Sequence, residues 1–251
     1  MSGHSKWSTI KHKKGAQDAK RGKVFTKVIK EITVAARMGG GGAEFNPRLR
    51  AAIQWAKSVN MPNDNITRAV KKGSGESGGD GFVEIIYEGY GPGNTAIVAE
   101  CLTDNTNRSY ASVRTNFNKN NGSLGAKNSV LFQFDKKGLI TIPKNSISED
   151  ELTEHAIEAG SDDIITDAED FYQVITEPSE LHNVQDFLDG KGIKVDNAEL
   201  SYFPQNPIEI SDLAVAQKVI GLIETLEDND DVQKVYSNFE ISDEILSELM
   251  S

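Results

Sequence analysis

The chain has 251 residues and a formal net charge of −11, and hydrophobic residues make up 37% of it. This composition is typical of globular proteins and, at roughly 100–150 residues per domain, favours two or three domains. The single cysteine, Cys101, excludes an internal disulfide and a zinc site built from cysteines. The polar, basic N-terminus and the lack of a long apolar run predict a cytoplasmic protein without a membrane segment.

Residues 1–22 form a basic arm with few apolar side chains, which we predict to be flexible. An aromatic side chain stands among its cations, because the arm contains Lys6, Trp7, Lys11, His12, Lys13 and Lys14. Cations interleaved with an aromatic ring suit RNA, since phosphates pair with the cations and a base can stack on the ring. Alternatively, Trp7 anchors the arm to the rest of the protein through an apolar contact.

Three short amphipathic helices are predicted next, over residues 19–38, from Asn46-Pro47 onward, and from Pro62 to Gly73. They indicate a three-helix domain over residues 23–73. On the first helix, one face is apolar and the opposite face is basic. The basic face is expected to be exposed and to extend the surface of the arm, and it holds Lys20, Lys23, Lys27, Lys30 and Arg37.

After a linker rich in glycine and serine, the spacing of apolar residues changes to that of strands. Strands are predicted at 82–87 and 95–102, a helix at 105–120, and a hairpin from strands 130–134 and 139–142. Cys101 lies within the apolar second strand, so we interpret it as a buried structural thiol rather than a nucleophile.

Residues 138–204 follow the order strand, helix, strand, strand, helix, strand, which indicates a ferredoxin-like α+β domain. A strand at 207–210, a helix at 212–227 and a strand at 232–237 come after it. We therefore predict a multidomain α and α+β fold, with an N-terminal three-helix domain followed by two α+β domains. The middle domain is built from 82–136 plus 206–251, and the ferredoxin-like domain of 138–204 is inserted in it.

Charge is distributed very unevenly along the chain. Residues 1–72 carry 16 Lys and Arg against 4 Asp and Glu, whereas residues 141–251 carry 5 against 27. A cationic N-terminal third beside an anionic remainder indicates a polyanionic partner that is bound at one end and repelled at the other.

No arrangement of residues indicates catalysis, a metal site or a cofactor. The four histidines are scattered, and the acidic cluster Asp228–Asp231 lacks the glycine and the terminal glutamate of a calcium loop. We interpret this cluster as a solvated turn. The sequence thus predicts a protein that is not an enzyme and that holds no metal or cofactor.

Five motifs are distinctive in length and composition: GHSKWSTIKHKK at 3–14, NMPNDNITRAVKKGSG at 60–75, YEGYGPGN at 87–94, LTDNTNR at 102–108 and VRTNFNKNNGSLG at 113–125. Together they resemble the YebC family over nearly the whole chain. The chain departs from the family pattern at Asn94 and Asn121, where the family favours glycine.

The resemblance implies a build of one all-α domain and two α+β domains, and a non-enzymatic regulator of gene expression. Members are described as DNA-binding transcriptional regulators. Relatives, including a mitochondrial translational activator of cytochrome c oxidase, act on translating ribosomes, and bacterial members are linked to relief of stalling at proline-rich stretches. Matched by motif, the cations and Trp7 of the basic arm are candidates for binding, and a second candidate surface comprises Tyr87, Tyr90, Arg108 and Arg114.

The first hypothesis is therefore a regulator that binds nucleic acid through its basic end. Family membership points to DNA, whereas the charge pattern favours ribosomal RNA, because the acidic remainder would repel a long duplex. The second hypothesis is a protein-interaction module that uses the acidic C-terminal domains. The third is an enzyme of phosphorylated metabolites in which the loop of residues 89–93 cradles a phosphate.

Overall fold

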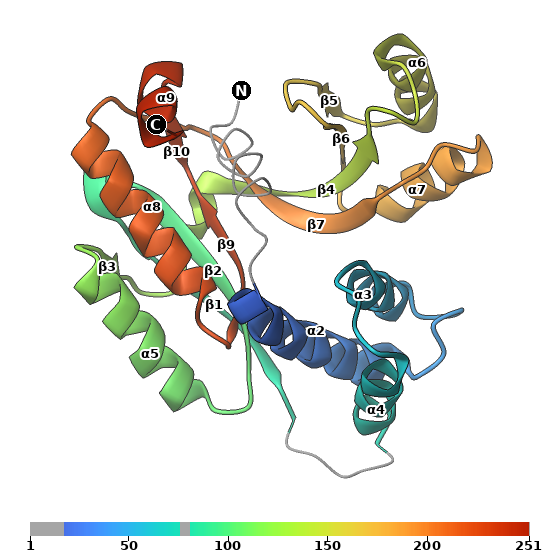
Figure 1. The fold of residues 1–251 in the computed structure, drawn as a ribbon, viewed down its shortest axis with the longest axis horizontal. Coiled ribbons are helices and arrows are strands. Elements are labelled where there is room, and N and C mark those ends of the chain that lie inside the picture. The colour runs from blue at the N-terminus through green and yellow to red at the C-terminus, as the bar shows by residue number, and fades with distance from the viewer. Residues whose placement is uncertain (1–17, 76–80, 251) are drawn as a thin grey trace. The chain divides into compact units, whose positions relative to one another are not determined.

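The computed structural model describes residues 18–75 and 81–250, which form two compact units (Figure 1). The smaller unit is Gln133–Asn206, and the larger one comprises the described residues before and after it. The fold class predicted from the sequence, α and α+β, is confirmed. The domain boundaries that the sequence suggests stay a prediction, and most of the basic arm lies outside the described residues.

The larger unit begins with three helices, α2 (Asp18–Gly39), α3 (Pro47–Ser58) and α4 (Asn63–Gly73). Their apolar faces, spaced by three and four residues, meet in one core that includes Val28, Ile32, Leu49, Ala52 and Ile66. Asn46 caps α3 as predicted, because its Oδ1 accepts a hydrogen bond from the backbone of Leu49 at 3.0 Å, and Pro47 follows in the first turn.

A four-stranded sheet follows in the same unit, in the order β3-β1-β2-β9. Its strands are β1 (Val83–Tyr90), β2 (Ala96–Thr103), β3 (Ser123–Leu124) and β9 (Val232–Ser237). Helices α5 (Thr106–Lys119) and α8 (Leu213–Glu227) lie side by side against this sheet (Figure 1). Four elements of this unit were not predicted from the sequence: β3, the 3-10 turn η1 (Pro92–Asn94), the strand β10 (Phe239–Ile241) and the helix α9 (Asp243–Met250). Strand β10 pairs in parallel with β8 (Ile208–Ile210).

The smaller unit has the predicted ferredoxin-like order. Its elements are β4 (Phe134–Pro143), α6 (Glu149–Ala159), β5 (Asp163–Ile165), β6 (Phe171–Thr176), α7 (Leu181–Gly190) and β7 (Asn197–Pro204). The strands pair antiparallel in the order β5-β6-β4-β7. The inward faces of the strands and the two helices share one core, which includes Ile140, Ile142, Leu152, Val174 and Leu188.

The hairpin predicted around residues 136–138 is wrong, because β4 runs without interruption through this segment and only a 3-10 turn, η2 (Leu131–Gln133), precedes it. Gly138 pairs with Thr176 on one side and with Leu200 on the other. A Cβ atom at Gly138 would lie 2.2 Å from Thr176 Oγ1. This glycine therefore permits close packing within a central strand and does not form a turn.

The two departures from the family pattern both have left-handed backbones. Asn94 and Asn121 each have a φ of 59°. Asparagine tolerates this conformation better than other residues with a side chain, because its short amide can bond locally. The substitutions thus keep the loop geometry that glycine would allow.

Candidate functional site

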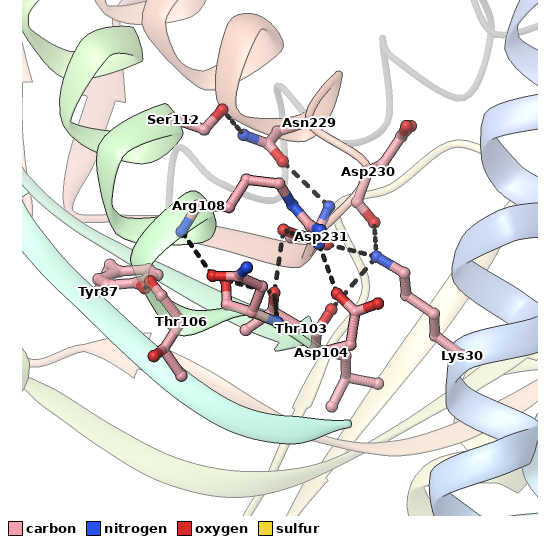
Figure 2. A network of polar contacts seen from close by, with 12 residues as sticks. Lys30, Tyr87, Thr103, Asp104, Thr106, Arg108, Ser112, Asn229, Asp230 and Asp231 are labelled. Carbon is pink, nitrogen blue, oxygen red and sulfur yellow. Dashed lines mark hydrogen bonds and ion pairs between the residues drawn. The ribbon is translucent and has the colours of Figure 1, made fainter. Parts of the chain in front are cut away.

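The larger unit contains a polar cavity of about 550 Å³, shared by helices α2 and α5 and the turn between α8 and β9. We call this turn, Asp228–Asp231, the acidic turn. The cavity carries charges of both signs and is lined by Lys23, Thr26, Lys30, Arg108, Ser112, Asn116, Thr225 and the acidic turn. Figure 2 shows the network of hydrogen bonds and ion pairs that several of these residues form.

Lys30 lies at the centre of this network and is only 8% exposed. Its Nζ lies 2.5 Å from Asp231 Oδ1 and donates to the carbonyl oxygens of Asp230 at 2.7 Å and Leu102 at 3.3 Å (Figure 2). An ammonium group has three protons to donate, so its hydrogen-bonding capacity is filled. The expectation that Lys30 lies on an exposed face is therefore wrong.

Asp231 links Lys30 to helix α5. Its Oδ2 accepts a hydrogen bond from Thr103 Oγ1 at 3.1 Å and a longer one from Arg108 at 3.4 Å. The same guanidinium nitrogen of Arg108 donates to Asp104 Oδ1 at 2.6 Å. The bond to Asp104 and the charge of Asp231 raise the pKa of Arg108, and the bond from Arg108 lowers the pKa of Asp104. The interpretation of Asp231 as part of a solvated turn is wrong.

Two further lysines of α2 reach the acidic turn and the residue before it. Lys27 Nζ donates to the backbone oxygen of Glu227 at 2.6 Å, and Lys23 Nζ lies 3.4 Å from Asp228 Oδ2. Together with Lys30 they stand at intervals of four and three residues, and we call these three residues the lysine stripe. These three lysines therefore do lie on one side of α2, as predicted, but they contact carboxylates and carbonyls of the same chain.

The remaining residues predicted on this basic surface have different environments. Arg37 donates to the backbone oxygen of Phe82, and Lys20 belongs to α2 but its side chain lies outside the described residues. The structure also does not describe Lys6, Trp7, Lys11, His12, Lys13 and Lys14.

In the second candidate surface, the two tyrosines donate hydrogen bonds to the backbone of the same chain. Tyr87 is 9% exposed and its hydroxyl donates to the backbone oxygen of Thr106 at 3.3 Å. Burial raises the pKa of Tyr87. The half-buried Tyr90 donates to the backbone oxygen of Ser129 at 3.2 Å. On α5, Arg108 and Arg114 are both exposed, and Arg108 belongs to the network around Asp231.

A buried carboxylate that the sequence analysis missed explains part of the YEGYGPGN motif. Glu88 is 2% exposed, and its two oxygens accept backbone hydrogen bonds from Asn128 at 2.6 Å, Val130 at 2.9 Å and Leu131 at 2.8 Å. It therefore fixes the loop that joins β3 to η2. The available signal was an acidic residue that directly follows the predicted strand at 82–87 and stands between Tyr87 and Gly89.

The glycines of the same motif do not form an open cradle for phosphate. Gly89 lies in β1, between Ile97 and Leu124 of the neighbouring strands. The backbone N–H of Gly91 donates to Thr95 at 2.8 Å, and a Cβ atom at Gly93 would lie 3.0 Å from Val215 of α8. This geometry removes the support for a phosphate site at residues 89–93.

Cys101 is buried as predicted, with 2% of its surface exposed. Burial, followed by the charge of Asp231, raises the pKa of its thiol to about 12. The group is therefore a thiol and not a thiolate at neutral pH, which makes it a poor nucleophile.

Helices α3 and α4 carry most of the exposed cations of the described helical segment, namely Arg50, Lys57, Arg68, Lys71 and Lys72, and α2 adds Lys23 and Arg37. Between residues 22 and 75, where side-chain burial is described, the exposed carboxylates belong to Glu44 and Asp64. The described part of this segment therefore presents a net positive surface on α3 and α4, separate from the lysine stripe.

Within the described residues, no group of three or more His, Cys, Asp or Glu side chains is placed to hold a metal ion. Over the same residues, no helix has the length and apolar character needed to cross a membrane.

Comparison with known families gives two matches that together span most of the chain. Residues 5–76 match the TACO1/YebC protein N-terminal domain, and residues 82–239 match the TACO1/YebC second and third domain. Among curated proteins, a relative from Desulfotalea psychrophila is 55% identical over 99% of both chains. Another from Geobacter sulfurreducens is 53% identical over the full length of both. Both are named probable transcriptional regulatory proteins.

A solved structure has the same fold. The crystal structure of a conserved hypothetical protein from Aquifex aeolicus superposes with a TM-score of 0.85 at 48% sequence identity. The match covers 91% of this chain and 94% of the other.

Proposed function

The chain belongs to the TACO1/YebC family, and we propose that it is a non-enzymatic regulator of gene expression that binds nucleic acid through its N-terminal third. The names of its relatives support a regulatory role. We further propose that its target is RNA, as presented by the ribosome, rather than duplex DNA.

The observation that carries this proposal is the surplus of 12 positive charges in residues 1–72. Lys27 and Lys30 of the lysine stripe are bonded to Glu227 and to the acidic turn, so they contribute little to an external surface, whereas Lys23 is exposed beside Asp228. Arg50, Lys57, Arg68, Lys71 and Lys72 of α3 and α4 remain exposed, and the cations of the basic arm precede them in the chain. A surface with such an excess binds phosphates, because neutralising each phosphate releases condensed counterions.

The preference for RNA rests on the acidic remainder of the chain. Residues 141–251 carry 27 acidic and 5 basic side chains, and this charge would repel a long duplex that passes the binding surface. A ribosome instead offers short exposed RNA segments beside basic proteins. The acidic domains would not be repelled by these basic proteins and could bind them through opposite charge.

Two measurements on the full chain test the proposal side by side. Co-sedimentation with ribosomes and binding to duplex DNA are followed across a salt series, and nuclease treatment separates RNA from protein contacts. We expect ribosome binding to weaken steeply with salt, with a slope of about −4 to −7 in log–log form for six to eight phosphates.

A matched pair of variants locates the surface. Replacing Lys6, Lys11, Lys13 and Lys14 by glutamine should weaken binding, whereas the same replacement at Lys119, Lys127, Lys194 and Lys218 should not. Failure of the native chain to bind any polynucleotide in dilute buffer would refute the proposal. Ribosome binding that survives nuclease treatment and high salt would favour the protein-interaction hypothesis.

A further inference from the structure

Phe45 is the most exposed of the large apolar side chains in the described residues, at 88% exposure. It lies in the loop between α2 and α3, immediately before the cap of α3. Isolated exposed apolar residues are common on protein surfaces, so exposure alone does not indicate a site. Two further features distinguish Phe45, namely a fixed backbone and a cation at the helix position that normally packs against it.

The loop that carries Phe45 is tied down by its own hydrogen bonds. Asn46 is buried, and its Nδ2 donates to the backbone oxygens of Ala35 at 2.8 Å and Gly40 at 2.9 Å. The backbone N–H of Phe45 donates to Gly42 at 3.2 Å, and Gly40 takes a φ of 84° that suits glycine. The backbone of Phe45 is therefore ordered while its ring faces solvent.

The position of Phe45 pairs it with a cation on the next helix. Phe45 precedes the cap, and Arg50 is the fourth residue of α3. Side chains at these two positions normally meet in a hydrophobic staple. Here the partner position holds an exposed arginine, so the ring has no apolar cover from α3.

Helix α3 continues this pattern along its solvent-facing side. Arg50, Gln54 and Lys57 are exposed and spaced by four and three residues, so they form one stripe on the helix. Leu49, Ala52 and Ala56 occupy the opposite, buried face. An exposed aromatic ring therefore stands at one end of a row of polar and cationic side chains.

We propose that Phe45 and this row form a binding site for unpaired RNA, in which a base stacks on the Phe45 ring and phosphates pair with Arg50 and Lys57. The inference rests on the proposed function and adds to it the kind of strand that is recognised. Aromatic rings accept any base by its flat face, and cations beside them follow the phosphate backbone. In a duplex the bases are already stacked on one another, so their faces are not available to Phe45.

The test compares an unpaired 12-nucleotide RNA with a duplex of the same sequence, using the full chain. Phe45→Ala should weaken binding of the unpaired strand by about 5- to 150-fold, the loss expected for one stacked base, and should leave duplex binding within about two-fold. Phe45→Trp should restore binding, and its added indole fluorescence should be quenched by the unpaired strand. Replacement of both Arg50 and Lys57 by glutamine should reduce the salt slope by about 1.4.

Matched controls come from the acidic part of the chain. Ile157 is 68% exposed on α6, beside Glu154 and Glu158, so Ile157→Ala removes exposed apolar surface without a cationic neighbour and should leave binding unchanged. Thermal melting of each variant should match that of the native chain, because the replaced side chains are exposed.

The outcomes separate this site from the proposed function. If the native chain and Phe45→Ala bind the unpaired strand equally, the site is refuted and the proposed function stands. Equal losses for the unpaired strand and the duplex also refute it, since stacking cannot explain them. If the native chain binds neither RNA, both proposals fail.

Discussion

The Lys30–Asp231 pair predicts how strongly α2 is held by the acidic turn. The two side chains are 10% and 7% exposed, and Lys30 fills all three of its hydrogen bonds within the protein. Lys30→Met keeps much of the apolar stem and removes the charge, so Asp231 Oδ1 loses its partner while the carboxylate stays buried. Removing one partner of a buried pair is destabilising by about 3–5 kcal/mol.

The lower end of this range applies here, because Asp231 Oδ2 keeps its contacts with Thr103 and Arg108. A loss of about 3 kcal/mol lowers the melting temperature by about 6–12 °C for a folding unit of this size. Differential scanning calorimetry measures the shift, and Lys218→Met, at an exposed position on α8, is the control. The double variant Lys30→Met with Asp231→Asn should lose less than the sum of the single variants, since their interaction is already absent. A shift below about 1 °C for Lys30→Met, or strict additivity, would refute the reasoning.

Three further predictions concern groups that the sequence alone left unexplained or untested. Glu88→Gln should speed amide hydrogen exchange at Asn128, Val130 and Leu131, because a neutral amide cannot accept three backbone hydrogen bonds as strongly as a carboxylate. Unchanged exchange rates would contradict the role of Glu88 in fixing this loop. Cys101 should resist a thiol reagent at pH 8 until the protein unfolds. Because burial raises the folded pKa of its thiol to about 12, the protein should lose stability as the pH rises from about 9, where the unfolded thiol ionises, to 12. Denaturation curves measured across this pH range test the sign of the change. Asn121→Gly should leave the free energy of unfolding nearly unchanged, whereas Asn121→Ala should lower it by about 1 kcal/mol, because alanine is strained at a positive φ. Equal changes for the two variants in urea titrations would contradict this.

Local signals in the sequence were sufficient for most helices and most strands. Asn46 followed by Pro47 marks the start of α3, and the structure begins this helix at Pro47. The helix predicted at 212–227 is confirmed to within one residue, because α8 spans Leu213–Glu227. Such elements depend on spacing and capping within a few residues, which is information that a single sequence contains.

Gly138 shows where local signals fail. Two lysines followed by a glycine are typical of a turn, and the segment is instead the middle of β4. The reason lies outside the segment, in the close approach of Thr176 and Leu181 to the glycine. A contact with residues about 40 positions away has no trace in the local pattern.

The candidate site shows the same limit for charged residues. Periodicity correctly placed Lys23, Lys27 and Lys30 on one side of α2, but it could not identify what faces them. The partner of Lys30 is Asp231, which is 201 positions away. A stripe of cations has the same sequence pattern whether it meets solvent, a phosphate or a carboxylate of the same chain.

This distinction changes how the charge of the N-terminal third is interpreted. A substitution in the lysine stripe perturbs the contact between α2 and the acidic turn, so any loss of binding it causes could follow from altered packing. The exposed cations Arg50 and Lys57 have no such structural task in the described contacts, and neutralising them tests binding alone. If nucleic acid binding is lost when the cations of α3 are neutralised but survives a mild change in the lysine stripe such as Lys23→Gln, then these two groups of cations bind different anions. The lysine stripe would then hold the protein's own carboxylates, and the α3 row would be the surface that phosphates reach.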